Sequence, residues 1–330
     1  MEDSAILAEE EVGMKVVAGI DVGKRELVVA VTGGEVRRYR NEAVGIEGLG
    51  QWLGAEGVTQ VVCEATGGYE RAVVEGVWAR GIAVHVAHPT RVRGFAQAMG
   101  QGAKTDPLDA QVLALYGEVF EVEGQGPAAG ARRELREVLS RRQQLVQHRV
   151  QERNRLEKGL KGSIKKSCER HVGWLDKEIA RLDKALQALV RGDTELSRGA
   201  ALYQSVSGVG ELTAATLLAY LPELGQGCGK GLTALAGLAP WPRDSGQRQG
   251  PRAIRGGRGV VRRALYMAAL SAIRSNQPLG AFYRRLRRRG KLGKVALVAV
   301  MRKLLLQLHA IARRGSPWVA AYSPENRLAP

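Results

Sequence analysis

Two acidic residues lie in otherwise apolar segments of the sequence, where a carboxylate needs a compensating interaction. Asp21 interrupts the apolar run VVAGIDVGK, in which its near neighbours are Val, Ala, Ile and Gly. A buried ionised carboxylate is costly unless it is paired or binds a metal. Glu64 ends a second apolar run, VVCEATGG, where a parallel strand would pass into a loop. Ligands of open α/β sheets bind at that edge, whereas strand alternation puts Cys63 on the opposite face.

A second pair of carboxylates lies in the segment KTDPLDA, where Asp106 and Asp109 are three residues apart. If a helix begins at Pro107, both side chains can point from its first turn to one side. The same residues also make an ordinary helix start, with Asp as N-cap, Pro at the first helical position and no chemistry. Together with Asp21 and Glu64 they favour a metal site. Four carboxylates suit two Mg²⁺ ions, or Mn²⁺, roughly 4 Å apart for phosphoryl transfer.

The elements around these carboxylates predict an α/β domain over residues 14–120. The pattern begins with an antiparallel three-strand opening in Lys15–Thr32 and Val36–Asn41, broken at Gly23-Lys24. Strands and helices then alternate, which is typical of α/β domains. The further elements expected are an amphipathic stretch at Ile46–Leu53, a strand at Thr59–Cys63, a helix at Tyr69–Arg80, a strand at Ala83–Ala87 and a closing helix from Pro107 to about Phe120. A disordered acidic tail (1–13) precedes this domain, and a Gly-rich linker (121–130) follows it.

Residues 131–195 change to a charge-rich helical pattern, in which apolar residues recur every three or four positions. This spacing predicts two long helices that form a coiled-coil hairpin or dimerisation arm, with the break near Gly159 and Gly162. A helical spacer without a partner fits the pattern equally well. The apolar positions are Leu135, Val138, Leu145, Leu156, Leu160, Ile164, Trp174, Leu175, Ile179, Leu182, Leu186 and Leu189.

Charge is distributed very unevenly along the 330 residues, whose formal net charge is +17. The segment Pro240–Pro330 holds 20 Lys or Arg and 2 Asp or Glu, whereas the rest of the chain holds 30 and 31. Codon usage would enrich arginine along the whole chain, so the asymmetry favours a polyanionic partner bound by the C-terminal end.

Other features bound the compartment and the partners. The three cysteines have no zinc or disulfide spacing, and no early apolar run is long enough for a signal peptide. The apolar stretch Val295–Leu308 is interrupted by Arg302 and Lys303, so we expect no membrane span. These observations predict a cytoplasmic, nucleoid-associated bacterial protein with no membrane partner.

The basic domain, residues 196–330, is expected to be helical and to grip phosphates. Gly208-Val209-Gly210 resembles the turn of a helix-hairpin-helix, in which Gly208 and Gly210 let backbone N–H groups approach a phosphate, although an ordinary turn is as good an explanation. The Gly- and Pro-rich segment 240–259 surrounds Ser245 with arginines that can bind phosphate oxygens, and two basic helices follow. A solvated face is the alternative for those helices. The candidate nucleic-acid contacts are Arg243, Arg248, Arg252, Arg255, Arg258, Arg262, Arg263, Arg284, Arg285, Arg287, Arg288 and Arg289.

Taken together, these motifs resemble a known family. The order Asp21, Glu64, Asp106, Asp109 is similar to the DEDD tetrad of RuvC-like domains with the RNase H fold. The combination of GIDVGK, EATGGYE, KTDPLDA and Ser245-Gly246 resembles the IS110 family of insertion-sequence transposases, which is related to the pilin-gene invertases. The fold class implied is α/β plus all-α: a RuvC-like N-terminal domain, a coiled-coil helical arm and a helical basic C-terminal domain.

The resemblance also implies a mechanism and partners. By composition alone Ser245 is a loop serine, since no His or Lys lies beside it to act as base. The family's motif makes it a nucleophile that forms a phosphoserine link to double-stranded DNA. Further implications are a homo-oligomer, dimer or tetramer, with composite active sites held by the coiled coil, a circular DNA intermediate, and a structured guide RNA encoded in the element.

The function expected from the sequence is therefore that of a Mg²⁺-dependent DNA transposase or site-specific recombinase. Two alternatives stay open at this point. In a metal-only Holliday-junction resolvase, water would attack the phosphate and Ser245 would be incidental. In a non-catalytic nucleic-acid-binding protein, the nuclease domain would be degenerate.

Overall fold

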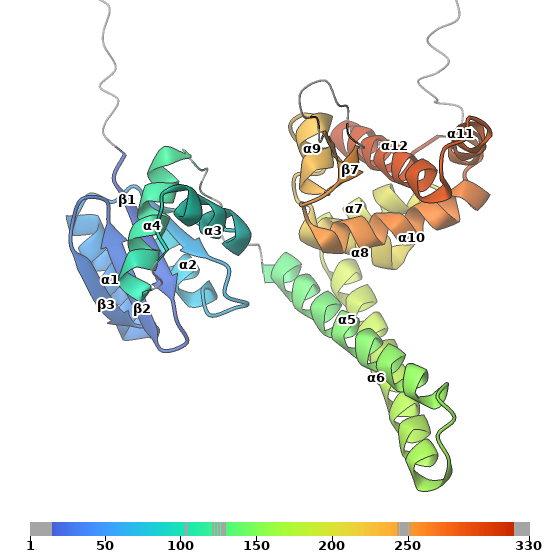
Figure 1. The fold of residues 1–330 in the computed structure, drawn as a ribbon, viewed down its shortest axis with the longest axis horizontal. Helices are drawn as coiled ribbons and strands as arrows, with labels where there is room; N and C mark the ends of the chain where they lie inside the picture. Colours follow the sequence, from blue (N-terminus) through green and yellow to red (C-terminus); the bar gives the residue numbers. More distant parts are fainter. Residues whose placement is uncertain are drawn as a thin grey trace, which may run out of the picture. The chain divides into compact units, whose positions relative to one another are not determined.

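The computed structural model describes residues 15–102, 105–120, 122, 124, 126, 130–242, 244, 250 and 252–319. The chain divides into two compact units, residues 1–128 and 129–330, which are described separately below (Figure 1).

The N-terminal unit is built on a mixed five-stranded sheet of order β3-β2-β1-β4-β5. As expected from the opening segment, β1 pairs antiparallel with β2, and β2 antiparallel with β3. The second half is parallel, with β4 between β1 and β5. The strands are β1 (Val17–Val22), β2 (Glu26–Val31), β3 (Val36–Arg40), β4 (Gln60–Glu64) and β5 (Ala83–Ala87).

Helices cover both faces of this sheet. One face packs against α1 (Ala43–Ala55) and α2 (Arg71–Trp78), and this core includes Cys63. The opposite face packs against α3 (Pro89–Ala98) and α4 (Asp106–Val119). The strands and the other helices of this unit match the expectations from the sequence, but α3 was not predicted.

Close packing between α4 and β1 depends on a glycine. A Cβ built on Gly19 would lie 2.0 Å from the Ala110 carbonyl oxygen and 2.4 Å from the Ala114 nitrogen. The missing side chain therefore lets the helix backbone rest directly on the strand. Because Gly19 and Asp21 share one face of β1, this contact brings the start of α4 toward the carboxylate.

The C-terminal unit begins with two long helices, α5 (Gly130–Leu156) and α6 (Gly162–Gly192), which run side by side away from the helical body (Figure 1). The helix break falls where the glycines predicted it, and Gly159 and Gly162 have φ values of 78° and 61°. Toward the far end, Leu145, Leu175 and Ile179 form a separate small core. Charged pairs also join the helices: Arg142 contacts Asp183 at 2.5 Å, and Arg149 contacts Asp176 at 2.7 Å.

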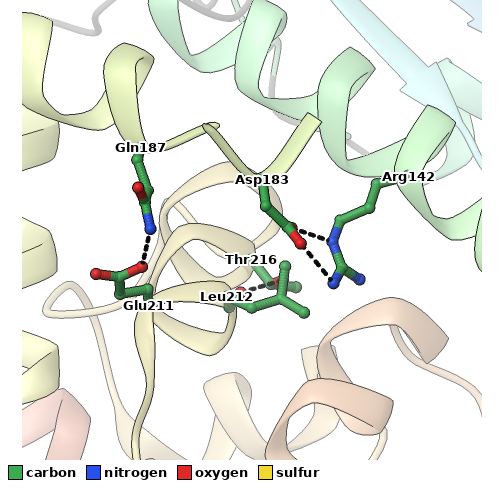
Figure 2. A network of polar contacts seen from close by, with 6 residues as sticks. All are labelled: Arg142, Asp183, Gln187, Glu211, Leu212 and Thr216. Atoms are coloured by element: carbon green, nitrogen blue, oxygen red, sulfur yellow. Dashed lines mark hydrogen bonds and ion pairs between the residues drawn. The ribbon is translucent and has the colours of Figure 1, made fainter. Parts of the chain in front are cut away.

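The end of the α5–α6 pair that lies nearest the other helices of the C-terminal unit packs against them. Figure 2 shows Arg142 of α5 against Asp183 of α6, and Gln187 of α6 donating a 2.6 Å hydrogen bond to Glu211 of α8. Leu135, Leu139 and Leu186 belong to the same apolar core as the remaining helices. Residues 131–195, expected from the sequence to be a domain of their own, thus share a core with the body.

The body consists of α7 (Thr194–Gln204), α8 (Glu211–Tyr220), α9 (Gly229–Leu235), α10 (Gly259–Ser275), α11 (Gln277–Arg288) and α12 (Gly293–Arg314). A short antiparallel ribbon joins β6 (Pro240–Trp241) to β7 (Ala253–Ile254). Within the described part of the chain, α12 is the one helix long and apolar enough to span a membrane, and half of that stretch is buried. Most of its buried residues belong to the core of the C-terminal unit.

Candidate active site

Asp21 and Glu64 lie near the carboxyl ends of two neighbouring parallel strands, β1 and β4. Both side chains are partly buried rather than fully enclosed. The parallel register pairs Ile20 with Cys63, so each acidic residue comes one position after this pair. Side-chain alternation therefore turns Asp21 and Glu64 toward the face that carries α3 and α4, opposite to Cys63.

The other two carboxylates enter from the first turn of α4. Thr105 is the N-cap, with extended backbone angles of −144° and 147°, and Asp106 is already helical. The alternative in which Asp106 caps the helix is therefore wrong. Asp106 is exposed and Asp109 is partly buried. Acidic groups in a first turn also interact favourably with the helix dipole.

One pocket of about 440 Å³ gathers all four carboxylates. Asp21, Glu64, Asp106 and Asp109 come from three elements and line it together. Placing them in one pocket is the juxtaposition that the sequence analysis expected. A further wall comes from α3, through Val92, Arg93, Ala96 and Gln97, with Gln101 and Gly102 beyond the helix.

The helix α3, which forms this wall, was not predicted from the sequence, although its first residues have a typical helix-start pattern. Pro89 occupies the first helical position, and the His88 ring accepts a 3.2 Å hydrogen bond from the Thr90 N–H as the N-cap. Proline at that position is a common helix start. The segment was missed because PTRVRGFAQA lacks a clear apolar stripe, and Val92 is its single fully buried side chain.

The donor chemistry of the pocket fits a hard divalent cation. Carboxylate oxygens are the ligands that Mg²⁺ and Mn²⁺ take in proteins, and four of them line this hollow. Among the described residues, no three His, Cys, Asp or Glu side chains stand close enough together to hold one ion as placed. Ligation therefore requires rotation of these side chains, for which an exposed Asp106 and the volume of the pocket leave room.

Cys63 takes no part in this pocket. It is fully buried in the core formed with α1 and α2, on the other face of the sheet. Burial raises the pKa of the Cys63 thiol to about 12, so it stays protonated and unreactive at neutral pH. The placement agrees with the strand-alternation argument.

In the sequence of the C-terminal unit, Ser245 comes after β6 and before β7. Arg243, Ser245, Gly246 and Arg248 lie outside the described residues. Nearby, Asp244 accepts a 2.5 Å hydrogen bond from Arg252 and a 3.1 Å hydrogen bond from the Gly250 N–H. The hydrogen bond from Arg252 lowers the pKa of Asp244.

Two comparisons with protein families match most of the chain. A transposase family model of the DEDD IS110 type matches residues 18–164, and a model for the IS116/IS110/IS902 transposase family matches residues 200–284. The chain belongs to the IS110 family of transposases. It is therefore an enzyme of the class that cleaves and exchanges DNA strands, it binds DNA, and its DEDD domain implies a divalent metal.

Individual relatives of this IS110-family chain agree. A pilin gene-inverting protein from Moraxella bovis is 27% identical over 318 residues, covering 92% of this chain and 98% of the relative. The pilin gene-inverting protein of Moraxella lacunata is 27% identical over 291 residues, covering 85% and 89%. An uncharacterized 43.6 kDa protein of insertion element IS110 from Streptomyces coelicolor is 32% identical over 138 residues, covering 40% and 33%.

The arginines that follow Ser245 in this transposase have varied surroundings. Arg258 is partly buried and contacts Glu223 through two hydrogen bonds of 2.5 and 2.6 Å, while also donating to the Tyr220 carbonyl at 3.0 Å. The Arg255 guanidinium lies 5.4 Å from the centre of the Trp241 ring. Arg262 donates to the Gly256 carbonyl at 2.6 Å. These contacts give Arg258 above all a structural role.

The remaining candidates fall into two groups. On the surface, Arg263 of α10 and the arginines of α11 and its C-cap are exposed: Arg284, Arg285, Arg287, Arg288 and Arg289. In the turn between α7 and α8, Gly208 has a φ of 102°, and a Cβ there would lie 2.6 Å from Ala272 of α10. Gly210 is the N-cap of α8. Packing against α10 thus explains Gly208 without a phosphate, and the helix-hairpin-helix role stays a prediction.

Proposed function

We propose that this transposase cuts and rejoins double-stranded DNA with Mg²⁺ held by Asp21, Glu64, Asp106 and Asp109, and with Ser245 as nucleophile. The observation that carries the metal part is the pocket that all four carboxylates line. The nucleophile rests on the family membership and on the Ser245-Gly246 motif.

The pocket supports this chemistry because a phosphodiester is an anion that four carboxylates alone would repel. A bound divalent ion supplies the positive charge that polarises the scissile phosphate and lowers the pKa of the attacking hydroxyl. The carboxylates hold it, and the partial burial of Asp21, Glu64 and Asp109 limits competing water.

The serine step conserves the energy of the DNA backbone bond. The Ser245 oxygen attacks phosphorus, a phosphoserine ester forms, and the P–O bond to the leaving strand breaks. The serine proton goes to a base or to solvent, and the leaving oxygen ends as a hydroxyl. In the reverse direction a strand hydroxyl attacks the ester, so strands are rejoined without ATP.

Assembly and guidance complete the proposal. We expect a homo-oligomer, dimer or tetramer, in which α5 and α6 act as a coiled-coil arm, and a structured RNA that selects the target. Support for the arm comes from its exposed Val150, Ile164 and Trp174, apolar side chains that a second helix pair would cover.

The test is detection of a covalent protein–DNA adduct on a denaturing gel with a labelled DNA substrate and the structured RNA encoded beside the gene. The adduct should need Mg²⁺ and vanish in Ser245→Ala, whereas the control Ser275→Ala should keep it. Ser275 is an exposed serine at the end of α10.

The metal-only resolvase and the non-catalytic binding protein predict different results in these assays. Cleavage without any adduct in Ser245→Ala would establish the metal-only resolvase and overturn the serine mechanism. Strand exchange that is unchanged in Asp21→Asn would overturn the metal site and favour the non-catalytic binding protein. Full activity without the RNA would show that a guide RNA is not required, and that part of the proposal would be wrong.

A further inference from the structure

A cationic side chain lies in the same pocket as the four carboxylates. Arg93 and Gln97 line it from α3, with Val92 and Ala96 beside them. The two polar residues are four positions apart and hence neighbours on one side of the helix. Because both are exposed, neither is needed to fill the core of the unit.

Aromatic packing fixes the position of α3 against α4. Phe95 lies between Arg93 and Gln97 in the sequence, and its ring meets Tyr116 edge-on at 5.6 Å and Phe120 at 5.5 Å. Tyr116 is almost fully buried and belongs to the core on this face of the sheet. The wall that carries Arg93 therefore sits on the same helix that supplies Asp106 and Asp109.

Arginine has a different part to play here from the carboxylates. A guanidinium is always protonated and donates hydrogen bonds but accepts none, so it cannot ligate a cation. It matches phosphate oxygens, which it can bind through two parallel N–H groups. Gln97 adds a neutral amide donor on the same side of the helix.

We propose that Arg93 contacts a non-bridging oxygen of the scissile phosphodiester, and that Gln97 assists in orienting it. The DNA phosphate would then lie between the carboxylates with their ion on one side and α3 on the other. Charge that develops on the phosphate during attack is stabilised from both sides, and the guanidinium is prepositioned for it. This inference rests on the proposed metal-dependent cleavage.

The experiment compares Arg93→Gln with Arg91→Gln in the full-length protein, using single-turnover cleavage of labelled DNA at saturating Mg²⁺. Arg91 is an exposed arginine of the same helix that does not line the pocket. We expect Arg93→Gln to slow cleavage about 100-fold, as when one transition-state donor is lost. Arg91→Gln should stay within twofold, and Arg93→Lys should recover part of the rate because it restores the charge.

A magnesium titration separates this role from simple charge balance. If Arg93 only neutralises the carboxylates, Arg93→Gln will lower the Mg²⁺ concentration needed for half-maximal cleavage and leave the saturated rate unchanged, which would overturn the inference. The proposed function has its own control, because Asp21→Asn should abolish cleavage. If Asp21→Asn is inactive and Arg93→Gln is fully active, the role proposed for Arg93 is wrong. The proposed metal-dependent cleavage would still stand.

Discussion

The carboxylate pocket and the arginine-rich segment after Pro240 organise charge in opposite ways. In the N-terminal unit, four acidic residues from β1, β4 and α4 meet in one hollow. In the C-terminal unit, arginines that are close neighbours in sequence contact separate partners, including Asp244, Trp241 and Glu223. A dense run of like charge is therefore a weaker guide to a site than sparse charges that a sheet brings together.

The arginines of the C-terminal unit themselves have two kinds of surroundings. Arg258 is used inside the fold, where its charge is matched by Glu223. The arginines of α11 lie on the surface, where a polyanion can reach them. We infer that DNA binding depends on the arginines of α11 more than on Arg258.

The largest effect is expected from the pocket. Asp109→Asn should reduce strand exchange at least 1000-fold, because a neutral amide cannot replace a ligand to the ion that offsets phosphate charge. DNA affinity, measured by filter binding, should change less than threefold. The matched control is Glu118→Gln on the same helix, an exposed carboxylate outside the pocket. Equal losses in both variants would show that the charge of α4 matters and not the pocket.

A smaller loss, in stability, is expected at Arg258. Arg258→Gln leaves the partly buried Glu223 without its guanidinium partner, which should cost about 2 kcal/mol. For a unit of this size, that lowers Tm by roughly 4–8 °C in a thermal melt at pH 7. Arg255→Gln is the control, since an exposed cation–π contact contributes only about 0.5 kcal/mol.

The same pair makes stability depend on pH. Partial burial works to raise the pKa of Glu223, but the hydrogen bonds and charge of Arg258, a backbone hydrogen bond and the charge of Arg136 together outweigh it, so the pKa is lowered. A lowered pKa adds stability above the unfolded value of about 4.3, and that stability is lost as the pH falls through the folded pKa. The Tm gap between wild type and Arg258→Gln should therefore narrow from pH 7 to pH 3.5. A gap that stays constant would mean that Arg258 acts through packing alone.

The sheet and its carboxylates could be predicted because their signals are local. β-branched runs mark the strands, and the carboxyl ends of neighbouring parallel strands meet at one edge wherever the helices lie. Asp21 and Glu64 could thus be brought together from sequence. Nothing local marks α3 as a wall of the pocket, since only Val92 is fully buried and the aromatic contact of Phe95 is with residues more than 20 positions away.

The arginine contacts could not be predicted for a related reason. Glu223 precedes Arg258 by 35 residues and lies in the turn after α8, so no spacing rule connects them. Composition makes residues 240–259 look like a uniform phosphate cradle. In the folded chain these arginines have different partners, and only the tertiary structure shows which guanidinium groups already contact a carboxylate.

The smallest effect, on salt dependence, tests the surface role of α11. Arg284 and Arg288 are four positions apart on this helix, and both are exposed. Replacing both by Gln should reduce the slope of log affinity against log salt by about 2, because each phosphate contact releases roughly 0.9 counterions. Cleavage at saturating DNA should be unchanged.

The control for net charge replaces Arg38 and Arg40 of β3, which pair with Glu26 and Glu42. It removes the same formal charge from arginines that already have carboxylate partners. If only the α11 variant lowers the slope, binding uses specific surface cations. Equal changes in both variants would mean that DNA responds to the overall charge of the protein, and the position of the arginines on α11 would then have no bearing on binding.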